Sequence, residues 1–225
     1  LEDAEVKMKN HKVLKRDTGI NGKIEFRNVT FAYENEKVLK TVNFSAKSGQ
    51  TIGIIGPTGS GKTTVVNLIS RFYNINEGKI LIDGNDINNA TLASLRTQMG
   101  IMLQDSFLFT GTIMENIRYS KLDGTEEEVI AAAKTVCAHD FIKDLPDGYN
   151  TMVEERGSTL SQGQRQLIAF ARAILADPDI LILDEATSSI DTETEVALQK
   201  GLEELLKGRT SFIVAHRLST IKNSS

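Results

Sequence analysis

Alternating apolar and polar positions dominate the first part of the chain. Residues 23–33, KIEFRNVTFAY, alternate in this way and are rich in β-branched and aromatic residues, which predicts a strand. Residues 37–56 show a similar strand-like pattern, with the apolar run TIGII at residues 51–55. Residues 77–86, EGKILIDGND, read as a hairpin-like strand between glycine turns. This part of the chain is therefore expected to be mainly β.

The next part of the chain has the apolar periodicity of helices, and two of the predicted helices begin with a capping-box sequence. Thr125 precedes Glu128 by three residues and opens the helix-rich stretch 127–145, EEVIAAAKTVCAHDFIKDL. Ser161 precedes Gln164 in the same spacing, and apolar residues then recur at helical intervals until Pro178. A capped helix start also attracts anions, because unpaired N–H groups and the positive end of the helix dipole point outward there.

Short apolar segments, predicted to be strands, separate the predicted helices. Residues 177–185, DPDILILDE, and residues 210–216, TSFIVAH, are such segments. Short apolar strands between helices are typical of a parallel sheet covered on both faces. The chain is therefore predicted to be an α/β protein.

Composition narrows the functional classes. The 225 residues are 40% hydrophobic and 25% charged, with a net charge of −4, so bulk charge gives no reason to expect a nucleic-acid partner. The single cysteine, Cys137, excludes an internal disulfide and fits a packed thiol in a helical run. No apolar run approaches the roughly 18 residues that span a bilayer. Because the sequence begins at Leu1 without methionine, we expect a piece of a longer protein.

A glycine-rich loop predicts a phosphate site. The segment GPTGSGKTT follows the strand 51–55 and precedes helical text, as a P-loop requires. Its glycines let backbone N–H groups face phosphate oxygens, Lys62 reaches the β and γ phosphates, and Thr63 offers a hydroxyl to Mg²⁺. The predicted nucleotide-binding residues of the loop are Gly56, Pro57, Thr58, Gly59, Ser60, Gly61, Lys62, Thr63 and Thr64.

The segment ILILDE adds two carboxylates. Asp184 ends a buried strand, where it can hold Mg²⁺, and Glu185 points away from it because side chains alternate along a strand. We therefore predict Asp184 as a metal ligand and Glu185 as the group that orients or deprotonates the attacking water. The alternative is an acidic pair in the first turn of a helix.

The order of P-loop, LSQGQ and ILILDE resembles the nucleotide-binding domain of ABC transporters. The resemblance runs from about Lys23 to Lys222; Gln162 departs from the common LSGGQ signature. It implies ATP and Mg²⁺ as cofactors. It also implies that Tyr33 stacks on adenine and that Gln104 acts on Mg²⁺ or the water, as a metal ligand and a catalytic residue. The same resemblance makes Asp191 the D-loop aspartate and His216 the catalytic switch histidine near the γ phosphate.

The resemblance also supplies an anion for the second capped helix. In this family the signature helix of one subunit faces ATP held by the P-loop of another, in a head-to-tail dimer. Ser161, Gly163 and Gln164 are thus expected to bind the nucleotide of a second ABC ATPase domain. The implied fold is a P-loop NTPase core with a mainly parallel sheet, an N-terminal antiparallel β subdomain and an inserted α-helical subdomain.

The region QDSFLFTGTIMENIRYS is similar to that of exporter-type members, in which membrane and ATPase parts share one chain. This implies a linker at 1–22, an ATPase domain at 23–225 with a helical subdomain at about 90–160, and a shortened C-terminus. It further implies a transmembrane domain as partner and a place at the cytoplasmic face of the cell membrane. The alternatives are a soluble ABC ATPase of DNA maintenance, one half of an asymmetric heterodimeric transporter, and a non-catalytic module. The exported substrate and the identity of the dimer partner do not follow from the sequence.

Overall fold

The structure, a computed structural model, describes residues 21–34, 36–102, 107–154, 159–185 and 192–215. The chain forms two compact units. The first comprises Leu1–Ile101, Asp179–Glu185 and Gly208–Ser225, and the second comprises Met102–Pro178 and Ala186–Lys207. Within the described ranges, no helix has both the length and the apolar character needed to cross a bilayer.

The first unit contains two sheets. The antiparallel sheet has the order β2-β1-β4-β5, and the second sheet has the order β3-β10-β9-β6. The strands are β1 (Ile24–Tyr33), β2 (Glu36–Ala46), β3 (Thr51–Ile54), β4 (Glu77–Ile82), β5 (Asn85–Asp86), β6 (Met99–Met102), β9 (Ile180–Glu185) and β10 (Thr210–Ala215). The helices of this unit are α2 (Lys62–Ile69), η3 (Ile87–Asn89) and α3 (Leu92–Arg96).

Strand β10 is parallel to both of its neighbours, β3 and β9. The predicted hairpin at residues 77–86 is present as β4 and β5, joined through Asp83 and Gly84. These pairings confirm the predicted α/β class, with a mainly parallel sheet and an antiparallel β region.

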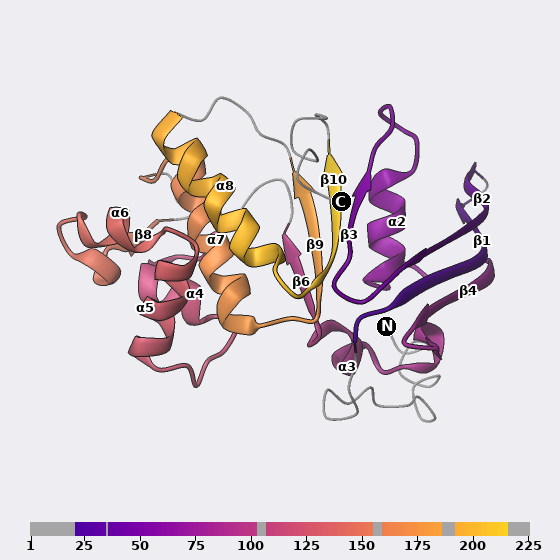
Figure 1. The fold of residues 1–225 in the computed structure, drawn as a ribbon, viewed down its shortest axis with the longest axis horizontal. Coiled ribbons are helices and arrows are strands. Elements are labelled where there is room, and N and C mark those ends of the chain that lie inside the picture. The colour runs from indigo at the N-terminus through magenta and orange to yellow at the C-terminus, as the bar shows by residue number, and fades with distance from the viewer. Residues whose placement is uncertain (1–20, 35, 103–106, 155–158, 186–191, 216–225) are drawn as a thin grey trace. The chain divides into compact units, whose positions relative to one another are not determined.

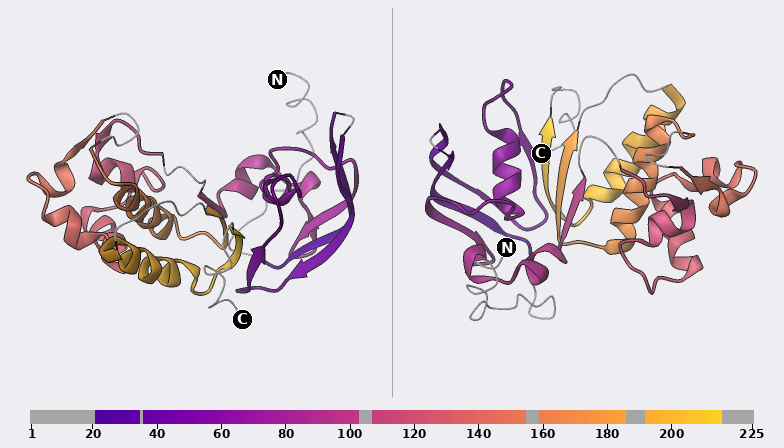
Figure 2. Two further views of the ribbon diagram at one scale, coloured as in Figure 1. Left: turned by 90° about the horizontal axis from the view of Figure 1, so that it is seen from above. Right: turned by 180° about the vertical axis from the view of Figure 1, so that it is seen from behind.

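One hydrophobic core joins the two sheets of the first unit. Helix α2 lies between the antiparallel strands and the parallel ones in Figure 1 and Figure 2. Its apolar residues, such as Leu68 and Ile69, pack with Phe26 of β1 and Phe212 of β10 in one buried cluster. The alternating apolar positions of β1 thus supply one wall of this core, as their period predicts.

The second unit is helical. It consists of β7 (Gly111–Thr112), α4 (Ile113–Arg118), α5 (Glu126–Thr135), α6 (His139–Lys143), η4 (Gly148–Asn150), β8 (Met152–Val153), α7 (Gln162–Ala176) and α8 (Thr192–Leu206). Helix α7 is central and packs against α4, α5 and α8. Both predicted capping boxes are present, Thr125 with Glu128 and Ser161 with Gln164.

The helical run around Cys137 is interrupted. Cys137 has φ 60° and separates α5 from α6, so the prediction that it sits within a helix is wrong. The carbonyl of Val136 lies where it would be only 2.7 Å from a Cβ on Gly201 of α8. The break thus occurs where the backbone of a third helix approaches.

Candidate functional site

The predicted phosphate loop connects β3 to α2 in the first unit. Gly59 and Gly61 have φ angles of 81° and 88°, in the left-handed region that glycine adopts without strain. A Cβ on Gly61 would also lie 3.0 Å from Leu39 Cδ2 and 3.1 Å from Val38 Cγ1. The backbone angle therefore favours glycine at position 61, directly before the helix, and Leu39 and Val38 would have to shift to admit a larger residue.

Lys62 is buried at the start of α2, with 7% of its surface exposed. Its Nζ donates to the carbonyl oxygens of Gly56 at 2.8 Å and Pro57 at 2.9 Å. An ammonium has three donors, so these two bonds leave one for a further acceptor. Because a buried charge with only neutral partners is costly, this arrangement suits an anion held in the loop.

Asp184 lies in one row with the end of β3. Val214 of β10 pairs with Ile54 on one side and with Asp184 on the other. Two strand spacings of about 4.8 Å put Asp184 roughly 10 Å from Ile54, two residues before the glycine loop. Neighbouring residues in a parallel register point to the same face, and Val214 packs in the core that contains α2. Asp184 therefore shares both the edge and the face of the sheet on which α2 begins.

Thr63 and Asp184 are oxygen donors of the kind that Mg²⁺ prefers. Thr63 is exposed in the first turn of α2, and Asp184 is partly exposed at the end of β9. A hydroxyl and a carboxylate are hard ligands, which Mg²⁺ prefers. Thr63 at the start of α2 and Asp184 at the end of β9 thus agree with the predicted metal site by ligand type.

Tyr33 reaches the same region from the end of β1. The hydroxyl of Thr64, in the first turn of α2, donates to the hydroxyl of Tyr33 at 3.4 Å. The Tyr33 ring is partly buried and packs against the core of the unit. This contact places the predicted adenine-stacking residue beside the phosphate loop.

The start of α7 belongs to the second unit. Ser161 Oγ accepts from the Gln164 N–H at 3.2 Å, and Gln164 Oε1 accepts from the Ser161 N–H at 3.0 Å. Ser161 is exposed, Gly163 is buried, and the first turn of α7 has no acidic residue.

Several predicted residues cannot be placed. Gln104, Asp191 and His216 lie outside the described residues, and so does the side chain of Glu185. Their predicted roles remain predictions.

The second unit also exposes an aromatic cluster that the residue pattern did not single out, formed by Phe107, Phe109 and Tyr119. These side chains are 50%, 38% and 57% exposed, and the Phe109 ring lies 4.3 Å from that of Tyr119. Arg172 of α7 holds the cluster, since its guanidinium lies 5.6 Å from the Phe109 ring and donates to the Phe107 carbonyl at 3.1 Å. Burial lowers the pKa of this guanidinium.

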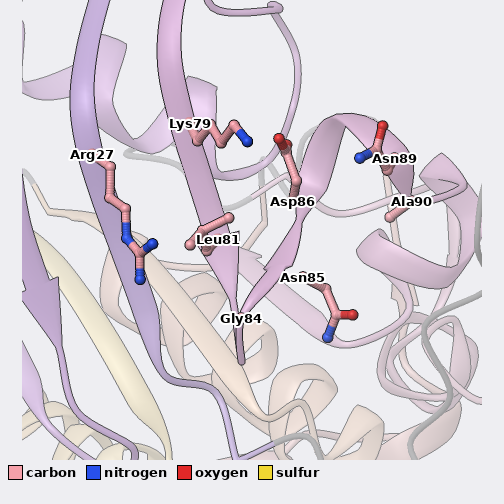
Figure 3. A pocket seen from close by; sticks show the side chains of 8 residues that line it. All are labelled: Arg27, Lys79, Leu81, Gly84, Asn85, Asp86, Asn89 and Ala90. Carbon is pink, nitrogen blue, oxygen red and sulfur yellow. The ribbon is translucent and has the colours of Figure 1, made fainter.

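A cavity of about 380 Å³ lies elsewhere in the first unit, on the antiparallel sheet (Figure 3). Arg27 and Lys79 line it as direct register partners on β1 and β4, and Asp86 and Asn89 lie across from them in the view. None of the predicted nucleotide-binding residues lines this cavity. Lys79 is exposed, unlike Lys62, which makes it a suitable control lysine.

Comparison with known proteins gives consistent matches. Residues 39–188 match the family model described as ABC transporter. The chain is 60% identical over 204 residues to an uncharacterized ABC transporter ATP-binding protein, YfiC, of Bacillus subtilis (strain 168), covering 90% of this chain and 34% of the relative. It is 51% identical over 205 residues to an ATP-dependent lipid A-core flippase of Syntrophus aciditrophicus (strain SB), covering 91% of this chain and 34% of the relative.

A solved structure of a bacterial Atm1-family ABC exporter with ATP bound is similar, with a TM-score of 0.83 and 44% identity. The match covers 90% of this chain and 36% of that chain. The chain therefore spans about a third of the length of the proteins that it matches.

Proposed function

Because the chain belongs to the ABC transporter family, we propose that it is the Mg²⁺-dependent ATPase domain of a membrane exporter. The observation that carries the proposal is the row Ile54, Val214 and Asp184. This row brings a carboxylate to the sheet edge from which the glycine loop leads into α2. A phosphate-binding loop and a carboxylate at one edge are what a nucleotide with its metal ion requires.

Each group of the first unit has a defined task in this proposal. Lys62 donates its remaining N–H to the β and γ phosphates, and Tyr33 offers its ring to the base. Thr63, Asp184 and Gln104 hold Mg²⁺, which would neutralise charge on the β and γ phosphates when bound. Glu185 orients or deprotonates the attacking water.

Two further residues of the proposed site, Asp191 and His216, are assigned from their positions in the sequence. We assign His216 to the γ phosphate and Asp191 to the neighbourhood of the nucleotide. Both assignments rest on the family resemblance.

The start of α7 acts on the nucleotide of a second subunit. The exposed Ser161 supports this role, as does the absence of an acidic residue in the first turn of α7. Two such domains would bury two ATP molecules between them, so that hydrolysis weakens the contact and resets the pair.

The exposed aromatic cluster Phe107, Phe109 and Tyr119 faces a transmembrane partner. Contiguous exposed apolar side chains are typical of interaction surfaces. About two thirds of each matched relative lies outside the aligned region, and the names of two of these proteins contain flippase or exporter. The transmembrane domain of the same transporter is accordingly the proposed occupant, at the cytoplasmic face of the membrane.

Replacement of two lysines tests the proposal. In the full-length protein, Lys62→Ala should weaken ATP binding at least tenfold, because a charge-assisted contact is worth roughly 1.5 to 3 kcal/mol. Lys79→Ala removes the same charge from the cavity in Figure 3 and should leave the Kd for Mg-ATP unchanged. Equal effects of the two changes on the Kd and on phosphate release would refute the assignment of the loop.

A further inference from the structure

A second tyrosine lies against the ring that is proposed to stack on the base. Tyr73 follows α2, and its ring centroid is 5.0 Å from that of Tyr33, with the two planes at 90°. Phe31, buried beneath, is 4.8 Å from Tyr33 and 5.8 Å from Tyr73. The two pairs that include Tyr33 are edge-to-face, whereas Phe31 and Tyr73 are tilted at 56°. Edge-to-face pairs at these distances are attractive and favour a defined tilt of the rings.

The segment that carries Tyr73 is firmly held. Arg71 Nη1 donates to the carbonyls of Ile87 at 3.0 Å and Ala90 at 2.6 Å. Arg96 donates to the carbonyls of Ser70 at 3.3 Å and Arg71 at 3.1 Å. Two arginines thus tie the turn after α2 to the elements that follow β4, so the position of Tyr73 does not depend on its own side chain.

Asn76 links this segment directly to the strand of Tyr33. Its N–H donates to the Thr30 carbonyl at 3.1 Å, and its Oδ1 accepts from the Ala32 N–H at 2.8 Å. The pairing of β1 with β4 ends at Thr30 and Glu77, so the Asn76 side chain accepts the Ala32 N–H on the side where β4 no longer pairs, while Ala32 pairs with Lys37 of β2 on the other side. The link fixes β1 one residue before Tyr33, where the strand register is irregular.

Of the two adjacent aromatic residues Phe72 and Tyr73, Tyr73 is the one whose ring contacts Tyr33. The side chains of Phe72 and Tyr73 are 52% and 47% exposed. Phe72 packs under Arg96 at 4.9 Å from its guanidinium carbon, whereas Tyr73 turns to the aromatic pair of β1. The pair therefore offers a test residue and a matched control in successive positions.

We propose that Tyr73 is a positioning residue for nucleotide binding, which sets the tilt of Tyr33 and thereby controls the part of the affinity that comes from the base. The inference rests on the proposed function, because it needs Tyr33 to stack on the base. Tyr73 acts through Tyr33 and is assigned no contact with the phosphates. Its loss should therefore affect only ligands that carry a base.

Two ligands separate positioning from general damage. Binding of Mg-ATP and of inorganic tripolyphosphate with Mg²⁺ is measured on the full-length protein and on Tyr73→Leu, Tyr73→Phe and Phe72→Leu. We expect Tyr73→Leu to raise the Kd for ATP about 3- to 10-fold, because part of the base-stacking contribution depends on the tilt of Tyr33, and to leave the Kd for tripolyphosphate within about twofold. Tyr73→Phe keeps the ring, and Phe72→Leu spares the Tyr33 contact, so both should match the unmodified protein.

Two results would overturn the inference. One is an unchanged Kd for ATP in Tyr73→Leu, and the other is an equal loss of ATP and tripolyphosphate, which marks a purely structural role. If Tyr73→Leu does not fold, Asn76→Ala provides the same comparison without removing a ring, and the same selective loss of ATP is expected. Failure of the unmodified protein to bind ATP would instead refute the proposed function itself, and the inference with it.

Discussion

Helices α2 and α7 begin in opposite ways. Helix α2 starts after Gly61 in a left-handed conformation, with no side-chain cap, and the preceding loop folds around Lys62. Helix α7 starts at Ser161 with a complete capping box and an exposed serine. The first start follows a glycine loop whose carbonyls bind the lysine at its first position, whereas the second is a helix end capped by its own side chains.

Charge unites these two starts and separates them from α4, α5 and α6, although the short helix α3 also lacks an acidic residue in its first turn. Neither α2 nor α7 has an acidic residue in its first turn. Helix α4 has Glu115 there, and α5 has Glu126, Glu127 and Glu128. Acidic side chains neutralise the positive end of the helix dipole and repel phosphate. The two starts assigned to ATP have thus kept this positive end, although they use different caps.

The largest effect is expected from Glu185→Gln. This change keeps the size of the side chain but removes the base, and general bases contribute roughly 10²- to 10⁴-fold to rates. Phosphate release by the full-length protein should fall at least 100-fold, while the Kd for Mg-ATP changes by less than about threefold. Glu203→Gln, an exposed position on α8, is the control and should hydrolyse ATP normally. A Glu185→Gln protein with near-normal turnover would show that the water is activated elsewhere.

Much of the fold could be predicted from sequence because its signals are local. The glycine loop, the capping boxes and the β4–β5 hairpin each depend on residues a few positions apart. The α5–α6 break at Cys137 could not be predicted, because no glycine or proline marks it and the approach of Gly201 is a tertiary contact. Tyr73 was missed for the same reason: it lies 40 residues from Tyr33, and Asn76 brings the two segments together. The two adjacent aromatic residues Phe72 and Tyr73 were the sequence feature that could have drawn attention to this position.

A smaller effect should distinguish two of the capped helices of the second unit, α7 and α5. In the Glu185→Gln background, which should trap ATP between subunits, Ser161→Arg puts bulk into the contact with the facing nucleotide. It should weaken the ATP-dependent association of ATPase domains about tenfold and leave ATP binding within each domain intact. Scattering or cross-linking with and without Mg-ATP measures this.

Thr125→Arg is the matched control for Ser161→Arg. It removes the same type of capping box from α5, whose first turn already carries three glutamates. Loss of a cap costs about 1 kcal/mol of stability in either helix. Equal loss of association in both variants would mean that helix stability, and not contact with a nucleotide, explains the Ser161→Arg result.

The smallest effect concerns the tie between the start of α2 and Tyr33. The Tyr33 hydroxyl accepts from Thr64 at 3.4 Å, which is long for a bond between hydroxyls and therefore weak. Tyr33→Phe removes this bond but keeps the ring, so the Kd for Mg-ATP should rise by no more than about twofold. Tyr33→Ala removes the ring and should cost roughly 1 to 3 kcal/mol of binding free energy, the range for base stacking on an aromatic. Titration of both variants side by side measures the difference. A tenfold loss in Tyr33→Phe would mean that the hydroxyl dominates, and that α2 holds the base region through Thr64 more than the aromatic face does.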